Sequence, residues 1–444
     1  MFSILKNHTY RNLFFAQVVA LVGTGLATVA LGLLAYDLAG KDAGAVLGTA
    51  LAIKMVAYVL IAPVAGAYAN RLPRRTLLVS LDVSRLAVVL LLPWVNQIWQ
   101  IYLLIFVLQS SSAAFTPVFQ ATIPEVLPDE ADYTRALTLS RLAYDLENLL
   151  SPALAAALLL VISYQGLFFG TAIGFIGSAL LVLSVALPIA TVAGPQLSIG
   201  RKLTQGLRIY LATPRLRGLL ALTLTAAAGS AMVIVNTVVI VREGLARPES
   251  AVAIALATYG AGSMLVALLL PRLLSRYSDR SVMLAAATTL CGVLMAIALV
   301  WPQLTPALQW LAMLGGWLLM GMSYAGLVTP GGRLLRRSSN ERDRPALFAA
   351  QFSLSHACWL IAYPVVGWLG AKVSIAAALW AMAALAMVGI ALAHWFWPEE
   401  DRDALPHRHD DLPADHPHLA AHAATSEHAH TFVIDDHHTR WPSR

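Results

Sequence analysis

Long apolar segments, separated by short polar ones, make up the chain from residue 13 to residue 397. Twelve of these segments reach about 20 residues, the length that a helix needs to cross a bilayer. Lipid offers the backbone no hydrogen-bond partners, so each segment must pair its own N–H and C=O groups as a helix. The predicted spans are 13–36, 45–69, 77–95, 99–122, 138–161, 165–188, 217–241, 251–271, 281–301, 307–330, 346–370 and 374–397.

The polar segments divide the twelve spans into two groups of six. The longest polar segment, 191–216, follows the sixth span, and an amphipathic stretch runs from Arg201 to Arg217. Arginine-rich loops follow the second span, at Gly66–Arg75, and the eighth span, at Pro271–Arg280. Loops at matching positions in each half are typical of a parallel repeat. We therefore expect an all-α membrane protein with twelve transmembrane helices in two pseudo-symmetric six-helix bundles.

Positive charges lie almost entirely on one side of the predicted membrane. With the N-terminus inside, nineteen Lys and Arg residues fall in inner segments and four in outer loops. Cytoplasmic loops carry such an excess, so we expect a multi-pass protein of the bacterial inner membrane with both termini in the cytoplasm. The expected domains are an N-terminal bundle at 1–190, a cytoplasmic central loop at 191–216, a C-terminal bundle at 217–397 and a disordered tail at 398–444.

Composition excludes several other classes of protein. Hydrophobic residues make up 58% of the chain and charged residues 12%, against roughly 25% charged residues in soluble domains. The net charge of +6 is explained by basic loops at a membrane, so no nucleic-acid partner is expected. Two cysteines, Cys291 and Cys358, exclude a disulfide framework and a thiolate metal site. Without a phosphate-binding loop or a catalytic constellation, we expect a transporter without a cofactor and not an enzyme.

The loop after the second span carries a recognisable motif. Its sequence, Gly66-Ala-Tyr-Ala-Asn70-Arg71-Leu-Pro-Arg74-Arg75, resembles the G-x-x-x-D-R-x-x-R-R signature of the major facilitator superfamily. The resemblance covers about residues 5–397 and implies a gating role for Gly66, Asn70, Arg71, Arg74 and Arg75. Asn70 replaces the family's acidic residue, and Asp82 and Arg85 at the start of the third span are candidates to supply the missing charge contact.

Two further segments narrow the resemblance to one branch of the superfamily. Residues 115–128, at the end of the fourth span, and residues 206–217, in the central loop, resemble the branch that contains siderophore and drug exporters. A histidine-rich end on such a body is similar to the nickel-resistance exporters of that branch. The resemblance implies metal export coupled to inward proton movement.

The tail has the composition of a metal-binding segment. Imidazole and carboxylate groups without thiolate suit Ni²⁺, Co²⁺, Zn²⁺ and Cu²⁺, while the scarcity of apolar residues predicts disorder without a ligand. Such a tail would capture, buffer or sense metal; the alternative is a solvated low-complexity segment. Nine of the twelve histidines are the candidate ligands: His407, His409, His416, His418, His422, His428, His430, His437 and His438.

Ionisable residues inside the predicted spans are candidates for transport and coupling, because charges in the membrane are costly. In the fifth span, Arg141 and Asp145 have the spacing of a helical pair, and Glu147 is the first choice for cation coordination or proton exchange. Lys54 in the second span is a candidate salt-bridge partner or a charge that sets stoichiometry. His356 in the eleventh span is either a ligand or a histidine satisfied by a neighbouring helix, and the resemblance places Lys54 near it.

Three functions are compatible with these sequence patterns. The first is a monomeric, proton-coupled exporter of nickel, and also of cobalt, whose partners are the lipid bilayer, divalent metal ions and protons. The second is an exporter of an organic solute, such as a siderophore or drug, with a regulatory metal-binding tail. The third is a membrane metal sensor that transports nothing. Twelve spans with a gating loop favour the exporters, and the tail favours the metal.

Overall fold

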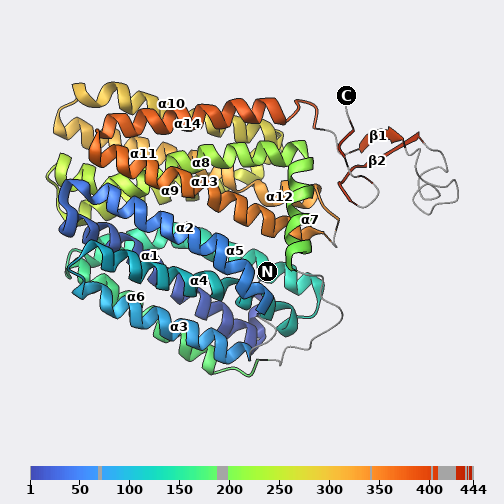
Figure 1. Cartoon of the computed structure of the whole chain (residues 1–444), viewed down its shortest axis with the longest axis horizontal. Coiled ribbons are helices and arrows are strands. Elements are labelled where there is room, and N and C mark those ends of the chain that lie inside the picture. Colours follow the sequence, from blue (N-terminus) through green and yellow to red (C-terminus); the bar gives the residue numbers. More distant parts are fainter. Residues whose placement is uncertain are drawn as a thin grey trace.

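The structure is a computed structural model of the whole chain (Figure 1). It describes residues 2–68, 73–187, 199–340, 343–401, 404–408, 427–435, 438 and 440–442, and some residues within helices and strands by their backbone alone.

In the described part of the chain, twelve long helices occupy the twelve predicted spans, and this confirms the expected fold class. Two shorter helices, α7 (Ile199–Ala212) and α12 (Gly331–Arg337), lie between them in the sequence. The long helices are α1 (His8–Ala39), α2 (Ala43–Tyr68), α3 (Arg74–Leu91), α4 (Ile98–Val126), α5 (Glu130–Leu158), α6 (Tyr164–Leu183), α8 (Pro214–Val239), α9 (Glu249–Leu274), α10 (Asp279–Val300), α11 (Pro306–Val328), α13 (Arg344–Lys372) and α14 (Ile375–Phe396).

The surface of the bundle is suited to lipid. Ten segments of the described residues are long and apolar enough to cross a membrane, and the first of them, His8–Ile61, contains α1 and most of α2. Large apolar side chains point outward along the helices, among them Leu268, Trp94 and Trp395, the last with 85% of its surface exposed. The chain is therefore a multi-pass membrane protein.

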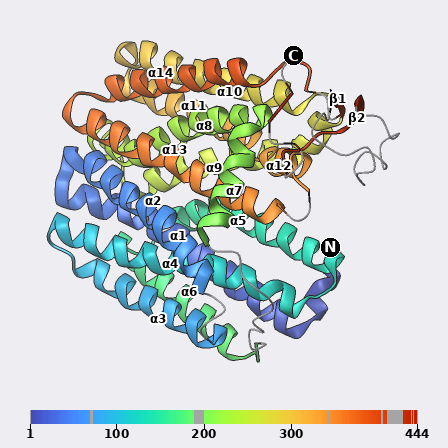
Figure 2. The ribbon, with the colours of Figure 1, turned by 45° about the vertical axis from the view of Figure 1, so that its right-hand side comes forward.

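The helices form two bundles that lie side by side (Figures 1 and 2). Helices α1–α6 make the N-terminal bundle, in which α1 packs on α6 and α2 on α4. The C-terminal bundle contains α8–α11, α13 and α14, with α8 against α14 and α9 against α11. Most of the contacts between the bundles are made by two helix pairs, α2 with α13 and α5 with α9.

The two ends of the paired bundles differ in charge. We call the end that holds the N-terminus, the first turn of α3, α7 and α12 the basic end (Figure 1). Arg74 and Arg75 begin α3 there, and α12 carries Arg333, Arg336 and Arg337. The opposite end holds the turn Gly40–Asp42 and the end of α13 at Lys372.

Helix α7 runs across the basic end, roughly transverse to the long helices (Figures 1 and 2). A Cβ atom added at its Gly206 would lie 2.2 Å from the carbonyl oxygen of Ala346, so only glycine lets α7 lie this close to α13. The Tyr210 hydroxyl donates to Gln351 of α13. Burial raises the pKa of Tyr210 well above its ordinary value, so the hydroxyl keeps its proton and remains a donor.

The amphipathic stretch predicted from Arg201 to Arg217 is divided between two helices. Helix α7 ends at Ala212, and α8 begins at Pro214, a residue favoured in the first turn because it lacks an N–H to satisfy. Arg215 and Arg217 therefore belong to α8. The Arg215 side chain is 1% exposed, and the sequence pattern gave no indication of this burial.

Helix α5 begins eight residues before its predicted span. Asp129 caps it, since its carboxylate accepts a hydrogen bond from the backbone N–H of Asp132 at 2.9 Å. The first turns carry an exposed ion pair between Asp132 and Arg135, at 2.7 Å. Hydropathy located only the apolar part of this helix.

The described part of the tail forms a small strand pair, where the sequence predicted disorder. Strands β1 (Ala404–Arg408) and β2 (Glu427–Thr431) pair in antiparallel fashion, with Ala404 opposite Thr431 and Arg408 opposite Glu427. Phe432 and Ile434, directly after β2, are 2% and 1% exposed. These two apolar residues give the strand pair a buried anchor that its overall composition did not suggest.

Glycine residues bring α2 and α13 together at the opposite end of the bundles. A Cβ atom at Gly48 would lie 2.5 Å from the carbonyl oxygen of Tyr363, and one at Gly367 would lie 2.3 Å from that of Gly44. Backbone therefore touches backbone across the two halves, as small residues allow between membrane helices. Nearby, Lys372 pairs with Asp42 at 2.9 Å, so the halves are in contact at this end.

Replacement of Gly367 by alanine should force α2 and α13 apart and lower both thermal stability and transport. Overpacking of this kind costs about 1–3 kcal/mol. Gly315→Ala is the matched control, because Gly315 has no atom within 4 Å of the added Cβ and alanine favours the helix. Melting of the purified proteins in detergent measures the difference. Equal melting temperatures for the two variants would contradict the tight contact.

Candidate functional site

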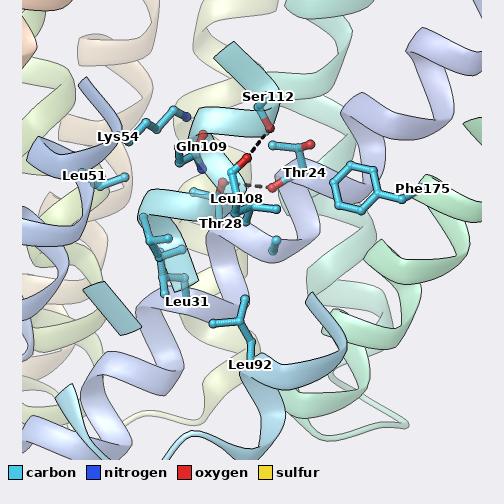
Figure 3. Close-up of a pocket in the computed structure, with 12 residues that line it drawn as sticks. Thr24, Thr28, Leu31, Leu51, Lys54, Leu92, Leu108, Gln109, Ser112 and Phe175 are labelled. Atoms are coloured by element: carbon cyan, nitrogen blue, oxygen red, sulfur yellow. Dashed lines mark hydrogen bonds between the residues drawn. The ribbon is translucent and has the colours of Figure 1, made fainter. Parts of the chain in front are cut away.

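A small cavity lies inside the N-terminal bundle, between α1, α2 and α4 (Figure 3). Its volume of about 20 Å³ is room for about one water molecule. Apolar side chains such as Leu31, Leu51 and Phe175 form part of its wall. The polar side chains that line it are Thr24, Thr28, Lys54, Gln109 and Ser112.

The polar lining combines one cation with neutral groups. The Thr28 hydroxyl donates to the Thr24 carbonyl at 3.0 Å, and the Ser112 hydroxyl donates to the Leu108 carbonyl at the same distance. Each hydroxyl oxygen keeps its lone pairs as acceptors. Lys54 extends from α2 toward Gln109 and Ser112 of α4 (Figure 3). The described lining therefore includes an ammonium group and several hydrogen-bonding groups.

Lys54 also belongs to a cluster that joins the two bundles. Its ammonium lies 5.9 Å from the centre of the Tyr58 ring. On the other side, Tyr58 stacks on His356 of α13, with 5.1 Å between ring centroids and 6° between planes. Phe352 completes the group, 4.1 Å from the His356 ring. Lys54 and His356, which were expected to be neighbours, are thus brought together around Tyr58.

The hydrogen bonds of His356 fix the orientation of its ring. Nδ1 lies 2.6 Å from the carbonyl oxygen of Phe352, and a carbonyl only accepts, so Nδ1 carries the proton. The neutral ring then presents Nε2 as an acceptor, which is the form in which imidazole binds a metal. The same hydrogen bond is also expected if His356 has only a structural role, because its partner, Phe352, lies in the same helix.

Helix α5 positions the three candidates of the fifth span. Arg141, Asp145 and Glu147 lie in its backbone, but their side chains are outside the described residues. Glu147 is 17 residues from the first residue of α5, about 25 Å along the axis. The helix packs on α1 and on α9, so these positions lie on one of the two helix pairs that make most of the contacts between the bundles.

The gating loop is described in part. Asn70 and Arg71 lie outside the described residues, and Gly66 is described by its backbone in α2. Arg74, 4% exposed, pairs with Glu125 at the end of α4, at 2.6 Å. Arg75 donates to the carbonyl of Leu183 at the end of α6. The loop residues thus fasten α3 to α4 and α6.

Glu125 was not among the candidates from the sequence, although it lies in the segment 115–128 that carried the resemblance. Hydropathy places it at a helix end, where an acidic residue is unremarkable. Its pairing with Arg74 depends on the packing of α3 against α4, which no local pattern shows.

Asp82 and Arg85 pair with each other inside the N-terminal bundle. They are 0% and 4% exposed and form a direct ion pair along α3. Asp82 also accepts a hydrogen bond from Ser178 of α6 at 2.8 Å. The guanidinium of Arg85 lies 4.2 Å from the Phe115 ring centre and 4.7 Å from that of Phe175. This buried pair connects α3 to α4 and α6 farther along α3 than Arg74 and Arg75 of the gating loop.

The C-terminal bundle has a charge contact at the corresponding place. Asp279, the first residue of α10, pairs with Arg337 at 3.1 Å and with Arg333 at 3.4 Å, both from α12. Arg337 also lies 3.8 Å from Asp401, which pairs with Arg215 at 3.2 Å. The start of the tail is therefore bound to the basic end through α8 and α12.

The described tail histidines lie next to one another. His438 contacts Asp435 through Nδ1 at 2.9 Å, and its ring lies 5.1 Å from that of His430. His407 and His428 are described by their backbone in β1 and β2. Among the described side chains, no group of three or more His, Cys, Asp or Glu could hold a metal ion. The other tail candidates, His409, His416, His418, His422 and His437, lie outside the described residues.

In the part of the chain that the structure describes, the long helices form two bundles of six, an arrangement that they share with solved transporter structures. Residues 13–245 and 219–416 match the model of the Major Facilitator Superfamily. These matches cover most of the chain, which therefore belongs to the major facilitator superfamily.

Individual relatives are distant. The chain is 27% identical over 124 residues to an uncharacterized MFS-type transporter, YfiS, of Bacillus subtilis strain 168. That match covers 28% of this chain and 30% of YfiS, so the chain spans less than a third of this curated relative.

Solved structures share the fold. The nucleoside transporter NupG superposes with a TM-score of 0.68 at 14% identity, over 87% of this chain and 98% of NupG. A D-xylose-proton symporter gives 0.66 at 14% identity, over 90% and 98%. An inward-facing, occupied bacterial homolog of the lysosomal transporter Spinster gives 0.67 at 11% identity, over 88% and 96%. At such identities the likeness concerns the fold alone.

Replacement of Asp82 by asparagine should destabilise the N-terminal bundle strongly. The change leaves the guanidinium of Arg85 buried without its carboxylate, at a cost of about 3–5 kcal/mol. Asp132→Asn is the matched control, because the Asp132–Arg135 pair has the same spacing but side chains that are 36% and 48% exposed. Exposed pairs contribute about 0.2–1 kcal/mol. Thermal melting of both purified variants tests the contrast, and an equal loss would show that burial of the Asp82 pair is unimportant.

Proposed function

We propose that the protein is a proton-coupled secondary exporter of divalent transition-metal cations, with nickel as the main cargo and cobalt as the second. It acts as a monomer in the bacterial inner membrane, with both termini in the cytoplasm, and confers metal resistance. The observation that carries the proposal is the concentration of nine of the twelve histidines beyond residue 398, interleaved with carboxylates. Imidazole and carboxylate oxygen together suit these metals.

The orientation follows from charge. The basic end carries the arginines of α3 and α12, and cytoplasmic segments are enriched in such residues. The start of the tail is bound to that same end through Asp401. In this orientation the tail binds metal in the cytoplasm, at the side from which an exporter must load.

The mechanism is alternating access between the two bundles, with the cargo near the middle of the membrane. The bundles meet along α2 with α13 and along α5 with α9, so these pairs change their contacts as access alternates. Glu147 on α5 is the group that exchanges a proton for the metal, because a carboxyl buried in the membrane binds protons readily. His356 contributes an imidazole from α13, with Nε2 as its acceptor atom.

Expression of the intact protein should lower nickel and cobalt accumulation in metal-sensitive bacteria. Glu147→Gln should abolish this effect, because the amide neither exchanges a proton nor carries the charge that binds a cation. Truncation after Pro398 should weaken the effect without removing it, since the tail supplies metal but does not carry it. Cell-associated metal is measured at equal membrane levels of each protein. Unchanged accumulation of every divalent metal with the intact protein would contradict metal export.

A second candidate function is export of an organic solute with an anionic or acceptor group, with the tail as a metal-dependent regulator. The observation that favours it is the cavity of the N-terminal bundle, where Lys54 provides a cation beside Thr24, Gln109 and Ser112. An ammonium attracts a carboxylate or phosphate and repels a bare metal ion. The same lining would suit a metal that moves as an anionic complex.

Substitution of Lys54 separates these two functions. If bare nickel is the cargo, Lys54→Gln should retain nickel export, because an ammonium cannot be a ligand of a metal cation. Lys54→Arg is the control that preserves the charge. Export is measured as nickel uptake into inverted membrane vesicles at fixed protein level. Loss of uptake in Lys54→Gln together with retention in Lys54→Arg would overturn export of the bare cation and support an anionic cargo.

A further inference from the structure

The strand pair of the tail places three histidines on one face. His407 of β1 lies directly opposite His428 of β2, and His430 lies opposite Leu405. Directly opposite residues of an antiparallel pair lie on the same face, with Cβ atoms about 4.5–5.5 Å apart. Residues two apart along one strand also share a face. Positions 407, 428 and 430 therefore belong to a single face of the strand pair.

The chain after β2 turns back and brings a fourth histidine to this group. The His438 ring lies 5.1 Å from that of His430. The turn is closed by the Asp435 carboxylate, which accepts from the backbone N–H of His438 at 2.8 Å, and by the Asp435 N–H, which donates to the His438 carbonyl at 3.1 Å.

Asp435 also fixes the His438 ring, through the 2.9 Å contact with Nδ1. Histidines that bind metals commonly donate their other ring N–H to a carboxylate, which sets the tautomer and aims the remaining nitrogen. The arrangement leaves Nε2 of His438 as the ligand atom. His438 is 4% exposed, so its orientation is well determined by packing.

Aromatic contacts connect this turn to the transporter body. Phe432 lies 4.8 Å from the His438 ring and 5.1 Å from the Trp441 ring. The Trp441 ring in turn lies 5.5 Å from the guanidinium of Arg215, at the start of α8. Arg215 also pairs with Asp401, where the tail begins. The histidine group and the first turn of α8 are thus linked through three successive ring contacts.

We propose that His407, His428, His430 and His438 form one divalent transition-metal site, and that metal binding there holds the tail against α8 at the basic end. Four imidazoles suit Ni²⁺, Cu²⁺ or Zn²⁺. The described side chains supply two of the ligands, and the register of the strands supplies the other two positions. This proposal assigns one site to four of the nine candidate histidines of the tail. It rests on the proposed function only for the choice of nickel as the probe.

Nickel binding to the purified full-length protein in detergent tests the site by equilibrium dialysis. The variant His428→Ala/His430→Ala/His438→Ala should lose the tightest Ni²⁺ site. The matched control, His416→Ala/His418→Ala/His422→Ala, removes as many histidines from the same tail and should keep it. Asp435→Asn should weaken binding about 10-fold, because the partner of a ligand histidine affects affinity by 10- to 100-fold. An equal loss of Ni²⁺ binding in both triple variants would show that the tail binds metal without a defined site, and would contradict the proposal.

Limited trypsin digestion tests the attachment to α8. Nickel should slow cleavage after Arg408 and Arg440 in the intact protein and in the control variant, but not in the His428 triple variant. Equal thermal melting of the two triple variants without metal excludes misfolding. Absence of protection by nickel in the intact protein would overturn the attachment. Both measurements are made without transport, so failure of nickel export in cells leaves them unaffected.

Discussion

The backbone contact between α2 and α13 is the constraint on which the rest of the arrangement depends. Gly48 and Gly367 let the two helices touch at the end opposite the N-terminus. Because the helices are rigid, that contact also sets how they run past each other farther along. Ten residues on from Gly48, Tyr58 meets His356 in a stacked pair. The cluster around Lys54 therefore depends on the absence of a Cβ atom at distant glycines, and movement at that contact must move the cluster.

Matching charge contacts hold the basic end of each bundle, but with the signs exchanged. In the N-terminal bundle an arginine, Arg74, begins the helix and Glu125 pairs with it. In the C-terminal bundle an aspartate, Asp279, begins the corresponding helix and Arg337 pairs with it. A carboxylate and a guanidinium attract each other whichever of them begins the helix. The two halves therefore preserve the charge contact although the residues differ. The reversed pair also places Arg337 within reach of the tail at Asp401.

The sequence predicted the spans well because lipid imposes a local rule: an apolar segment of sufficient length must be a helix. The site depends on contacts between segments that are far apart. Glu125 lies 51 residues from Arg74, and the strands of the tail pair across a gap of 18 residues between Arg408 and Glu427. Composition indicated that the tail carries ligands, but only the register shows which histidines share a face.

Two chemistries occupy different parts of this transporter. The cavity of the N-terminal bundle is lined by the Lys54 ammonium and by hydrogen-bonding groups, whereas the tail is rich in imidazole and carboxylate. The tail suits a bare cation, whereas an ammonium such as that of Lys54 suits an anionic or acceptor group. Under the proposed function, the charge of Glu147 changes with proton exchange: its ionised form binds the metal, and its protonated form releases it. Coulomb interactions in a low dielectric are large enough for one proton to reverse the preference.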